Sequence, residues 1–488
     1  MGVTVQTNPP QGETPQIIRR INAAYDWDGP DDPDDPRNFP ALQRIFSISV
    51  IAALAFVSCF AGAIYAPAQE LVMDEFRESP LVAVLPLSLY NLGLAFGPLV
   101  GAPLSERYGR KIVFVATTPV FVLFMLGAGF ARTMAGLVAC RFFAGIFASP
   151  NINNASATIL DYTRGQYRGL SLGIYYSMPS LGATVGPLVG GFVVRSQGWR
   201  WTQWVAIIVT VAAYVPVLFT PETYKRVVLR RRALKMGLSD TSSHRMTLGR
   251  AIRHFFTVLI LRPFHMLCTE PIVTFVSLYN GFIIGLLYAF VVSVPWIFQH
   301  YYGFNQTSES LSYLGITLGT LVACVPFVLI DIFYYQRRLQ TWQSARGSEE
   351  QMSPEHRLIS AMVGSILLPT SLIIAGWTAH FHIHWMVPIF FQGMTMVASL
   401  LIYAGANLFM LDAYGPLYGA SAASAMMFSR YFLSFAFPLF SLRVFQALGV
   451  GWATTILAGC TVLMAPIPWL FFAYGPRIRA RSKYETSS

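Results

Sequence analysis

Twelve apolar segments, each long enough to cross a lipid bilayer, limit the folds open to this chain more than any other feature. A membrane-spanning helix needs about 20 predominantly apolar residues. Only 12% of the residues are charged, whereas soluble proteins carry about 25%. We therefore predict an all-α membrane protein with twelve transmembrane helices near residues 45–67, 82–102, 112–131, 134–159, 169–193, 203–220, 272–298, 309–334, 357–379, 385–409, 420–442 and 452–474.

Two polar stretches divide these segments into two groups of six. We predict an N-terminal six-helix bundle at 45–220 and a C-terminal six-helix bundle at 271–474, arranged as pseudo-symmetric halves. Residues 221–270 are expected to form a cytoplasmic linker with a short amphipathic helix near 247–262, and 475–488 a cytoplasmic tail. Six aspartates interleaved with prolines between Asp26 and Asp35 cannot bury a core, so 1–44 is expected to be a disordered cytoplasmic tail.

The distribution of basic residues sets the orientation of the chain. The net charge is +11, which by itself would also suit a nucleic-acid-binding protein. With the N-terminus in the cytoplasm, 27 of the 34 lysines and arginines fall in cytoplasmic segments and five in outer loops. This bias follows the positive-inside rule, so both termini are predicted to be cytoplasmic and the basic runs to face the bilayer rather than nucleic acid.

Residues 182–191, with the sequence GATVGPLVGG, form an unusual pattern inside the fifth apolar segment. Glycines spaced by four leave bare backbone on one face of a helix, which lets a second helix approach closely. A proline within the helix removes a backbone donor and permits a kink. A plain packing helix would also account for this pattern, whose marked positions are Gly182, Gly186, Pro187, Gly190 and Gly191.

Several further motifs carry a family resemblance that covers nearly the whole chain. Residues 102–111, APLSERYGRK, resemble the signature between the second and third helices of the major facilitator superfamily, with Ala102 and Glu106 where glycine and aspartate are usual. The decapeptide 182–191 resembles the antiporter motif of exporters in that superfamily. The fungal drug:proton antiporters with twelve spans, a group that includes multidrug-resistance and polyamine-transporter-like members, are similar at CRFFAG 140–145, PETY 221–224, GVGW 449–452, DDPRN 34–38 and 474–484.

The resemblance implies roles for individual residues. It implies an inner gate of inter-helix salt bridges at Glu106, Arg107, Gly109, Arg110 and Lys111, with Asp161 as the partner of Arg110. It also implies that Arg141 takes part in proton coupling, although an arginine neutralised by a carbonyl or a carboxylate for packing alone is the other interpretation. An ionised side chain within the bilayer is costly and usually faces a cavity or a partner.

The acidic partner of Arg141 cannot be chosen from the sequence, because no aspartate or glutamate lies at the centre of an apolar segment. Three alternatives stay open. An acid at a helix end reaches the cavity, or another group couples the proton, or the protein is not coupled to protons.

A substrate pocket is expected from polar and aromatic residues within the apolar segments. A buried amide in lipid needs a partner, so these side chains should face protein or water. The set comprises Tyr65, Tyr90, Asn91, Asn153, Asn154, Tyr176, Tyr279, Asn280, Tyr288, Gln392 and Asn407. We select Asn91, Tyr279, Asn280 and Gln392 as substrate-binding candidates and add Arg430, the second arginine within a span, which suits an anionic substrate or an aromatic wall.

The remaining signals point away from other classes of site. His380, His382 and His384 alternate in a predicted outer loop without an accompanying cysteine or acid, so an interfacial loop is favoured over a metal site. We find no nucleophile elbow, phosphate-binding glycine loop or zinc pattern, and we expect no enzyme activity, cofactor or metal. Asn305-Gln306-Thr307 is an N-glycosylation sequon in a predicted outer loop.

These observations favour a secondary active transporter. Its expected partners are a small-molecule substrate, protons and the lipid bilayer. The expected activity is proton-coupled efflux of small organic compounds such as drugs, toxins or secondary metabolites by alternating access. The alternative is an importer or facilitator of an organic acid or polyamine with the same fold. We expect a monomer in the plasma membrane rather than the vacuolar membrane.

Overall fold

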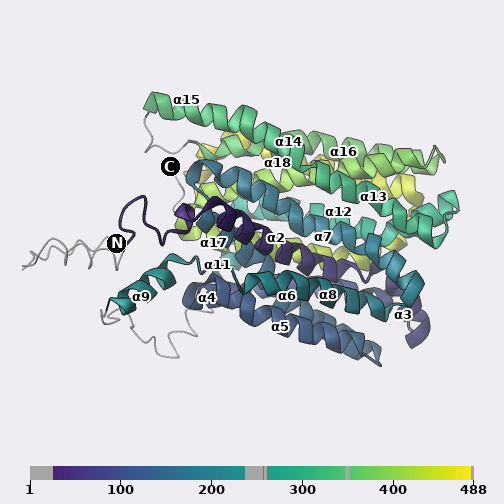
Figure 1. Cartoon of the computed structure of the whole chain (residues 1–488). Helices are drawn as coiled ribbons and strands as arrows, with labels where there is room; N and C mark the ends of the chain where they lie inside the picture. The colour runs from purple at the N-terminus through teal and green to yellow at the C-terminus, as the bar shows by residue number, and fades with distance from the viewer. Residues whose placement is uncertain (1–25, 237–256, 258–260, 347–351, 485–488) are drawn as a thin grey trace, which may run out of the picture.

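The computed structural model describes residues 26–236, 257, 261–346 and 352–484, and its regular elements in these ranges are helical. The long helices run side by side, with α9 and α15 at one end and α3 at the other (Figure 1). The helices of the first half are α2 (Ala41–Ala63), α3 (Gln69–Phe76), α4 (Pro80–Tyr108), α5 (Arg110–Gly129), α6 (Met134–Tyr162), α7 (Arg168–Gln197) and α8 (Arg200–Val217).

The second half follows a short helix, α9 (Lys225–Lys235), in the linker. Its elements are α11 (Arg262–Thr269), α12 (Pro271–Tyr302), α13 (Gln306–Val322), α14 (Cys324–Ile330), the π-helix η5 (Asp331–Gln336), α15 (Arg337–Arg346), α16 (Ile359–His380), α17 (Met386–Met464) and α18 (Pro466–Arg479). The amphipathic helix expected near 247–262 lies outside the described residues, apart from 257, 261 and 262.

The twelve predicted spans correspond to helical segments of the described chain. Ten stretches are long and apolar enough to cross a membrane. The last of these, Tyr418–Arg479, is interrupted at Gly449 and covers the predicted spans 420–442 and 452–474. The shorter helix α8, with 18 residues, corresponds to the predicted span 203–220 but is not among the ten, so the helices are consistent with twelve spans.

Side-chain caps define where several of the helices begin. Ser79 accepts a hydrogen bond from the backbone N–H of Val82 at the start of α4, and Thr133 accepts one from Gly136 at the start of α6. Such caps satisfy N–H groups that the first helical turn leaves unpaired. The polar turns between apolar segments therefore specify the helix boundaries.

Within α17, two glycines stand where loops were expected. Gly415 has φ 57° and Gly449 has φ 73°, so each breaks the helix at a single residue. A positive φ is strained for residues with a Cβ, which explains glycine at both joints. The segment 386–464 thus contains three helices joined without intervening loops.

Residues 26–40 correct the expectation that 1–44 is disordered. Asp32 and Asp34 each pair with Arg232 of α9 at 2.6 Å, and Lys225 pairs with Asp26. Only 2% of Asp32 is exposed, and its hydrogen bond with Arg232 lowers the pKa of the carboxyl to about 2. The acidic segment is therefore ordered by ion pairing with the basic linker helix and not by burial of an apolar core.

Candidate functional site

A small cavity lies in the second half, where α7 of the first half packs against it. Its volume is about 20 Å³, close to the space that one or two water molecules need. The cavity is therefore too small for an organic compound in this conformation, and its lining comes from the second half except for Ser180 of α7. It is lined by Ser180, Asn280, Ile283, Ile284, Leu287, Thr320, Met396, Ser399, Leu400, Tyr403 and Arg430.

Arg430 is the charged residue of this cavity. Its side chain is buried, with 3% exposed, and its guanidinium carbon lies 3.7 Å from the centre of the Tyr403 ring. Within the described residues, its Nε and Nη1 atoms have no hydrogen-bond partner. None of the described residues that line the cavity is acidic. The site thus holds a desolvated cation that faces an aromatic ring.

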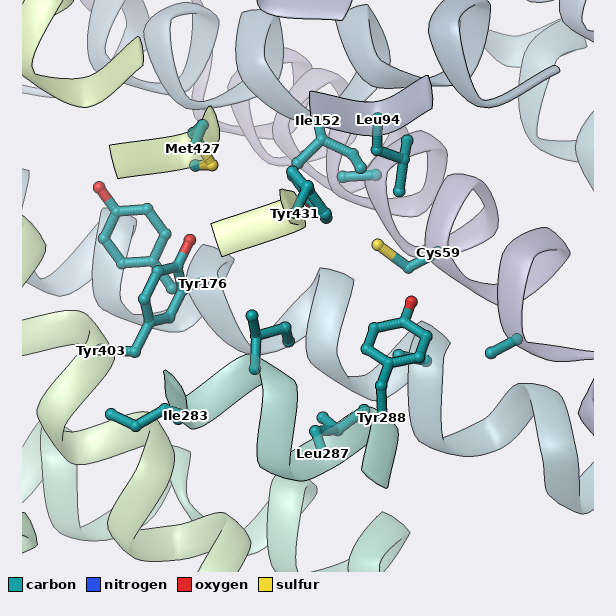
Figure 2. Close-up of a cluster of buried hydrophobic side chains, with 14 of the residues drawn as sticks. Cys59, Leu94, Ile152, Tyr176, Ile283, Leu287, Tyr288, Tyr403, Met427 and Tyr431 are labelled. Atoms are coloured by element: carbon teal, nitrogen blue, oxygen red, sulfur yellow. The ribbon is translucent and has the colours of Figure 1, made fainter. Parts of the chain in front are cut away.

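Tyrosines from several helices surround this point. Figure 2 shows Tyr403 beside Tyr176, and the ring centres of the two are 5.0 Å apart. In the same view, the hydroxyl of Tyr288 points towards Cys59, and Tyr431 lies on the other side of the Cys59 sulfur. The cluster draws on both halves of the chain, so its geometry depends on how the halves are placed.

The structure brings two of the five sequence-predicted binding residues into the cavity. Asn280 and Arg430 line it, and the Asn280 side chain donates to the Met426 sulfur at 3.3 Å while its Oδ1 has no partner among the described residues. Asn91, Tyr279 and Gln392 are buried but lie outside the lining.

Asn91 makes a different contact. Its side-chain amide in α4 donates to the carbonyl oxygen of Ser434 in α17 at 3.4 Å. This bond joins the first half to the second, which makes Asn91 a contact between halves in this conformation.

Sequence reasoning missed Tyr403 and the small hydroxyl residues of the cavity. Tyr403 lies in an apolar segment like many other aromatic residues, and nothing local distinguishes it. The sequence offers one indication, which is that Tyr403 lies 27 positions before Arg430, on the neighbouring span. Such a pairing becomes visible only when the helices are assembled.

Arg141 has carbonyl partners in this conformation. It is fully buried in α6 and donates to the carbonyl oxygens of Ala61 at 2.7 Å and Gly62 at 2.6 Å. Its guanidinium also lies 5.3 Å from the Tyr65 ring centre and 4.9 Å from that of Tyr90. The charge is therefore solvated by backbone dipoles at the end of α2 and by aromatic faces.

The glycines of residues 182–191 place α7 against two different partners. A methyl group at Gly182 would overlap the Phe56 carbonyl oxygen of α2, and one at Gly190 would overlap the carbonyl oxygen of Ile64. At Gly186 it would lie 2.8 Å from the backbone nitrogen of Ile64. These glycines, with the buried Pro187 between them, therefore hold α7 close to α2 within the first half.

Gly191 instead faces the second half. A methyl group there would overlap the Ser310 hydroxyl of α13. Near the opposite end of α7, methyl groups at Gly169 and Gly173 would overlap the Arg357 guanidinium and the Phe327 ring. Helix α7 therefore touches the second half on both sides of Ser180, its residue in the cavity lining.

A cluster at the end of the first half contains the predicted inner-gate residues. Arg110 Nε lies 3.5 Å from Asp161 Oδ2, and Arg110 Nη1 donates to Ser105 at 2.6 Å. Glu222, in the stretch after α8, accepts hydrogen bonds from the backbone nitrogens of Arg110 at 2.8 Å and Lys111 at 3.1 Å. This carboxylate caps α5, where a negative charge is stabilising.

The other predicted inner-gate residues lie outside the ion pair of Arg110 with Asp161. A methyl group at Gly109 would overlap the Glu222 carboxylate, so this glycine permits the close approach. The Lys111 ammonium donates to the Leu218 carbonyl at 2.8 Å, and Arg107 is exposed. Glu106 lies in α4, and its side chain falls outside the described part of the structure.

The second half contains a comparable ion cluster. Arg357, just before α16, lies 3.2 Å from Asp331 and 3.0 Å from Asp412. In the first half, the arginine at the start of α5 likewise pairs with an aspartate near the end of α6. The partner of Asp331 lies 26 positions later in the chain, so this pairing is not apparent from neighbouring residues.

The loops predicted to lie outside hold the two remaining predicted features. Asn305 is exposed, and its side-chain oxygen accepts from the Ser308 N–H at 3.0 Å at the start of α13. His382 contacts the Tyr301 carbonyl at 2.8 Å, and the His380 ring packs against Trp377. The histidine loop is thus built on aromatic contacts.

Comparisons with known proteins agree on the class of the chain. A family model described as Major Facilitator Superfamily matches residues 51–438. The chain is 33% identical to "Efflux pump radE" of Floropilus chiversii, over 96% of this chain and 87% of that protein. It is 31% identical to "Polyamine transporter 4" of Saccharomyces cerevisiae, over 94% of this chain and 73% of that protein. Its fold is similar to that of the xylose transporter XylE from E. coli, with a TM-score of 0.61 and 14% identity over 88% of this chain and 98% of that one.

Proposed function

We propose an export function for this chain, which belongs to the major facilitator superfamily and is therefore a multi-pass membrane transporter of small molecules. In our proposal it moves small organic compounds out of the cell, in exchange for protons, as its two halves rock about the central cavity. The observation that carries this proposal is the small cavity where α7 of the first half meets the second half, with contacts of α7 to the second half on both sides of Ser180.

Two findings support export over import. The relative from Floropilus chiversii is named an efflux pump. Residues 182–191 also resemble the motif of exporters, and their glycines pack α7 tightly against α2. A rigid pair of helices beside the cavity suits a carrier that must limit leaks.

We place proton coupling at the ion clusters and not in the cavity. The lining of the cavity has no acidic member among the described residues. Asp161, Asp331 and Asp412 instead pair with Arg110 and Arg357, and Arg357 also contacts the start of α7 across the boundary between halves. Protonation of one of these carboxylates would weaken an ion pair that helps to close this end.

A second candidate is import or facilitated movement of an organic acid or polyamine. The relative from Saccharomyces cerevisiae is named a polyamine transporter, which favours this alternative. For either function we propose a monomer in the plasma membrane.

Accumulation of labelled compounds in intact yeast cells tests the direction and the coupling together. Cells that express the chain should retain less compound than control cells, and the difference should grow when the external pH is lowered from about 7.5 to 5. Arg443→Gln, a change at an exposed outer residue, serves as a matched control. Higher accumulation on expression would support import, and an effect independent of pH would overturn proton coupling.

A further inference from the structure

We propose that Arg430 binds a carboxylate or a similar acidic oxygen of the transported compound, and that Tyr403 stacks against the planar body of that compound. The proposal rests on the proposed transport function and adds the substrate class, which is an aromatic organic anion. It assigns a polar anchor and an apolar wall to one cavity.

Arg141 and Arg430, the two arginines in the interior of predicted spans, are both buried but differ in how their charge is satisfied. Arg141 donates to the carbonyls of Ala61 and Gly62, so it is part of the packing of the first half. Arg430 retains two N–H groups that have no hydrogen-bond partner among the described residues. A buried cation with unused donors is costly, so a ligand that supplies acceptors would stabilise it.

The chemistry of the arginine selects the ligand group. A guanidinium is planar and offers paired donors that match the two oxygens of a carboxylate. Nε and Nη1 are both without partners among the described residues, so each can donate a hydrogen bond to an acidic oxygen of a ligand. A neutral amide offers a single acceptor oxygen and no negative charge, so it should bind more weakly.

The rest of the cavity suits an aromatic body. The Tyr403 ring lies 3.7 Å from the guanidinium carbon, and the Tyr176 ring centre lies 5.0 Å from that of Tyr403. Four aliphatic residues and Met396 also face the cavity. A flat apolar group beside the anchored carboxylate would therefore contact rings and methyl groups.

The same arrangement disfavours polycations. The cavity contains an arginine and, within its described lining, no acid that could attract an amine. Like charges at close range in a water-poor site repel strongly. The inference thus separates aromatic acids from polyamines as substrates.

Binding to the purified full-length protein tests the inference without transport. The probes are 2-naphthoate with its neutral partner 2-naphthamide, indole-3-acetate with indole-3-acetamide, and spermidine, each titrated by thermal shift at constant salt. The wild type should bind each acid at least about tenfold more tightly than its amide. Arg430→Gln should remove this preference, Arg430→Lys should keep part of it, and Arg443→Gln should leave it unchanged.

Several results would overturn the inference. These are equal affinity of the wild type for acid and amide, no binding of any probe pair, tighter binding of spermidine than of the acids, or an unchanged preference in Arg430→Gln. If Arg430→Gln fails to fold, the ratio of acid affinity to amide affinity is compared between the wild type and Arg430→Lys instead. A separate measurement of export distinguishes the two proposals. Preference for acids without export would contradict only the transport function. Export without preference for acids would contradict only the assignment of Arg430.

Discussion

Replacing Gly191 with alanine should open the end of the cavity next to α13. The added methyl group would overlap the Ser310 hydroxyl and lie 2.7 Å from the Ser310 Cβ. Carbon atoms in contact are normally about 3.5–4.0 Å apart, so rotation of the hydroxyl alone cannot relieve the overlap. Helices α7 and α13 would have to separate by roughly 1 Å wherever they touch.

The size of the effect follows from the cost of overpacking, which is about 1–3 kcal/mol. Gly191 and Ser310 belong to different halves, so this cost falls only on conformations in which this end is closed. A difference of this size changes an equilibrium by roughly 5- to 150-fold. Gly186→Ala provides a contrast, because its methyl group would press on α2 within the same half and destabilise every conformation alike.

Cys59 can report the opening. It is 3% exposed, and its sulfur points into the space between Tyr288 and Tyr431 (Figure 2). In a variant that keeps Cys59 as its one cysteine, we expect Gly191→Ala to raise the rate of labelling by a membrane-impermeant thiol reagent, added outside intact cells, by about 5- to 150-fold. Gly186→Ala should lower the melting temperature without this increase.

A compensating substitution at Ser310 tests whether the clash with Ser310 causes the faster labelling. Ser310→Gly removes both clashing atoms, and the Ser310 Cα then lies 3.7 Å from the new methyl group, which is an ordinary contact. The double variant should therefore label at nearly the rate of the parent. The reasoning is refuted if Gly191→Ala reaches the cell surface but labels no faster, or if the double variant stays fast.

Three further outcomes are expected. Arg110→Ala, which removes the ion pair with Asp161, should abolish transport but leave surface expression unchanged, and normal transport would contradict the gate assignment. Because the pKa of Asp32 is lowered to about 2 from its ordinary 3.8, its pairing with Arg232 should persist above pH 4 and be lost as the pH falls from about 4 to 2. Spin labels at Asp31→Cys and Arg231→Cys measure the distance between the acidic segment and α9. An increase of this distance near neutral pH would contradict the lowered pKa of Asp32. Endoglycosidase treatment should change the electrophoretic mobility of the wild type. Asn305→Gln should abolish this change, whereas Asn154→Gln should leave it intact.

The spans were predictable because lipid imposes a simple requirement on length and hydropathy. The segment predicted at 134–159 became α6 at Met134–Tyr162, and that at 169–193 became α7 at Arg168–Gln197. Caps such as Thr133 set these limits locally, so they can be read from nearby residues. The family motifs likewise identified the superfamily before any helix was placed.

The rotation of each helix was not predictable, because lipid and protein neighbours are both apolar. Gln392 and Tyr403 lie on one span, yet only Tyr403 lines the cavity. Pairing across long separations was missed for the same reason, as the contact of Asp331 with Arg357 shows. The order of residues 26–40 was missed because it depends on Arg232, which lies about 200 positions away.

The single-residue joints of α17 affect how the second half can be engineered. Gly415 and Gly449 connect three successive helices with no slack between them. A domain motion that changed the angle at one joint would have to turn its neighbours as well, so these helices should move as one rigid body. Tags or reporter domains inserted at either glycine should therefore disturb the whole unit, although both positions are turns in a membrane protein, where insertions are usually attempted.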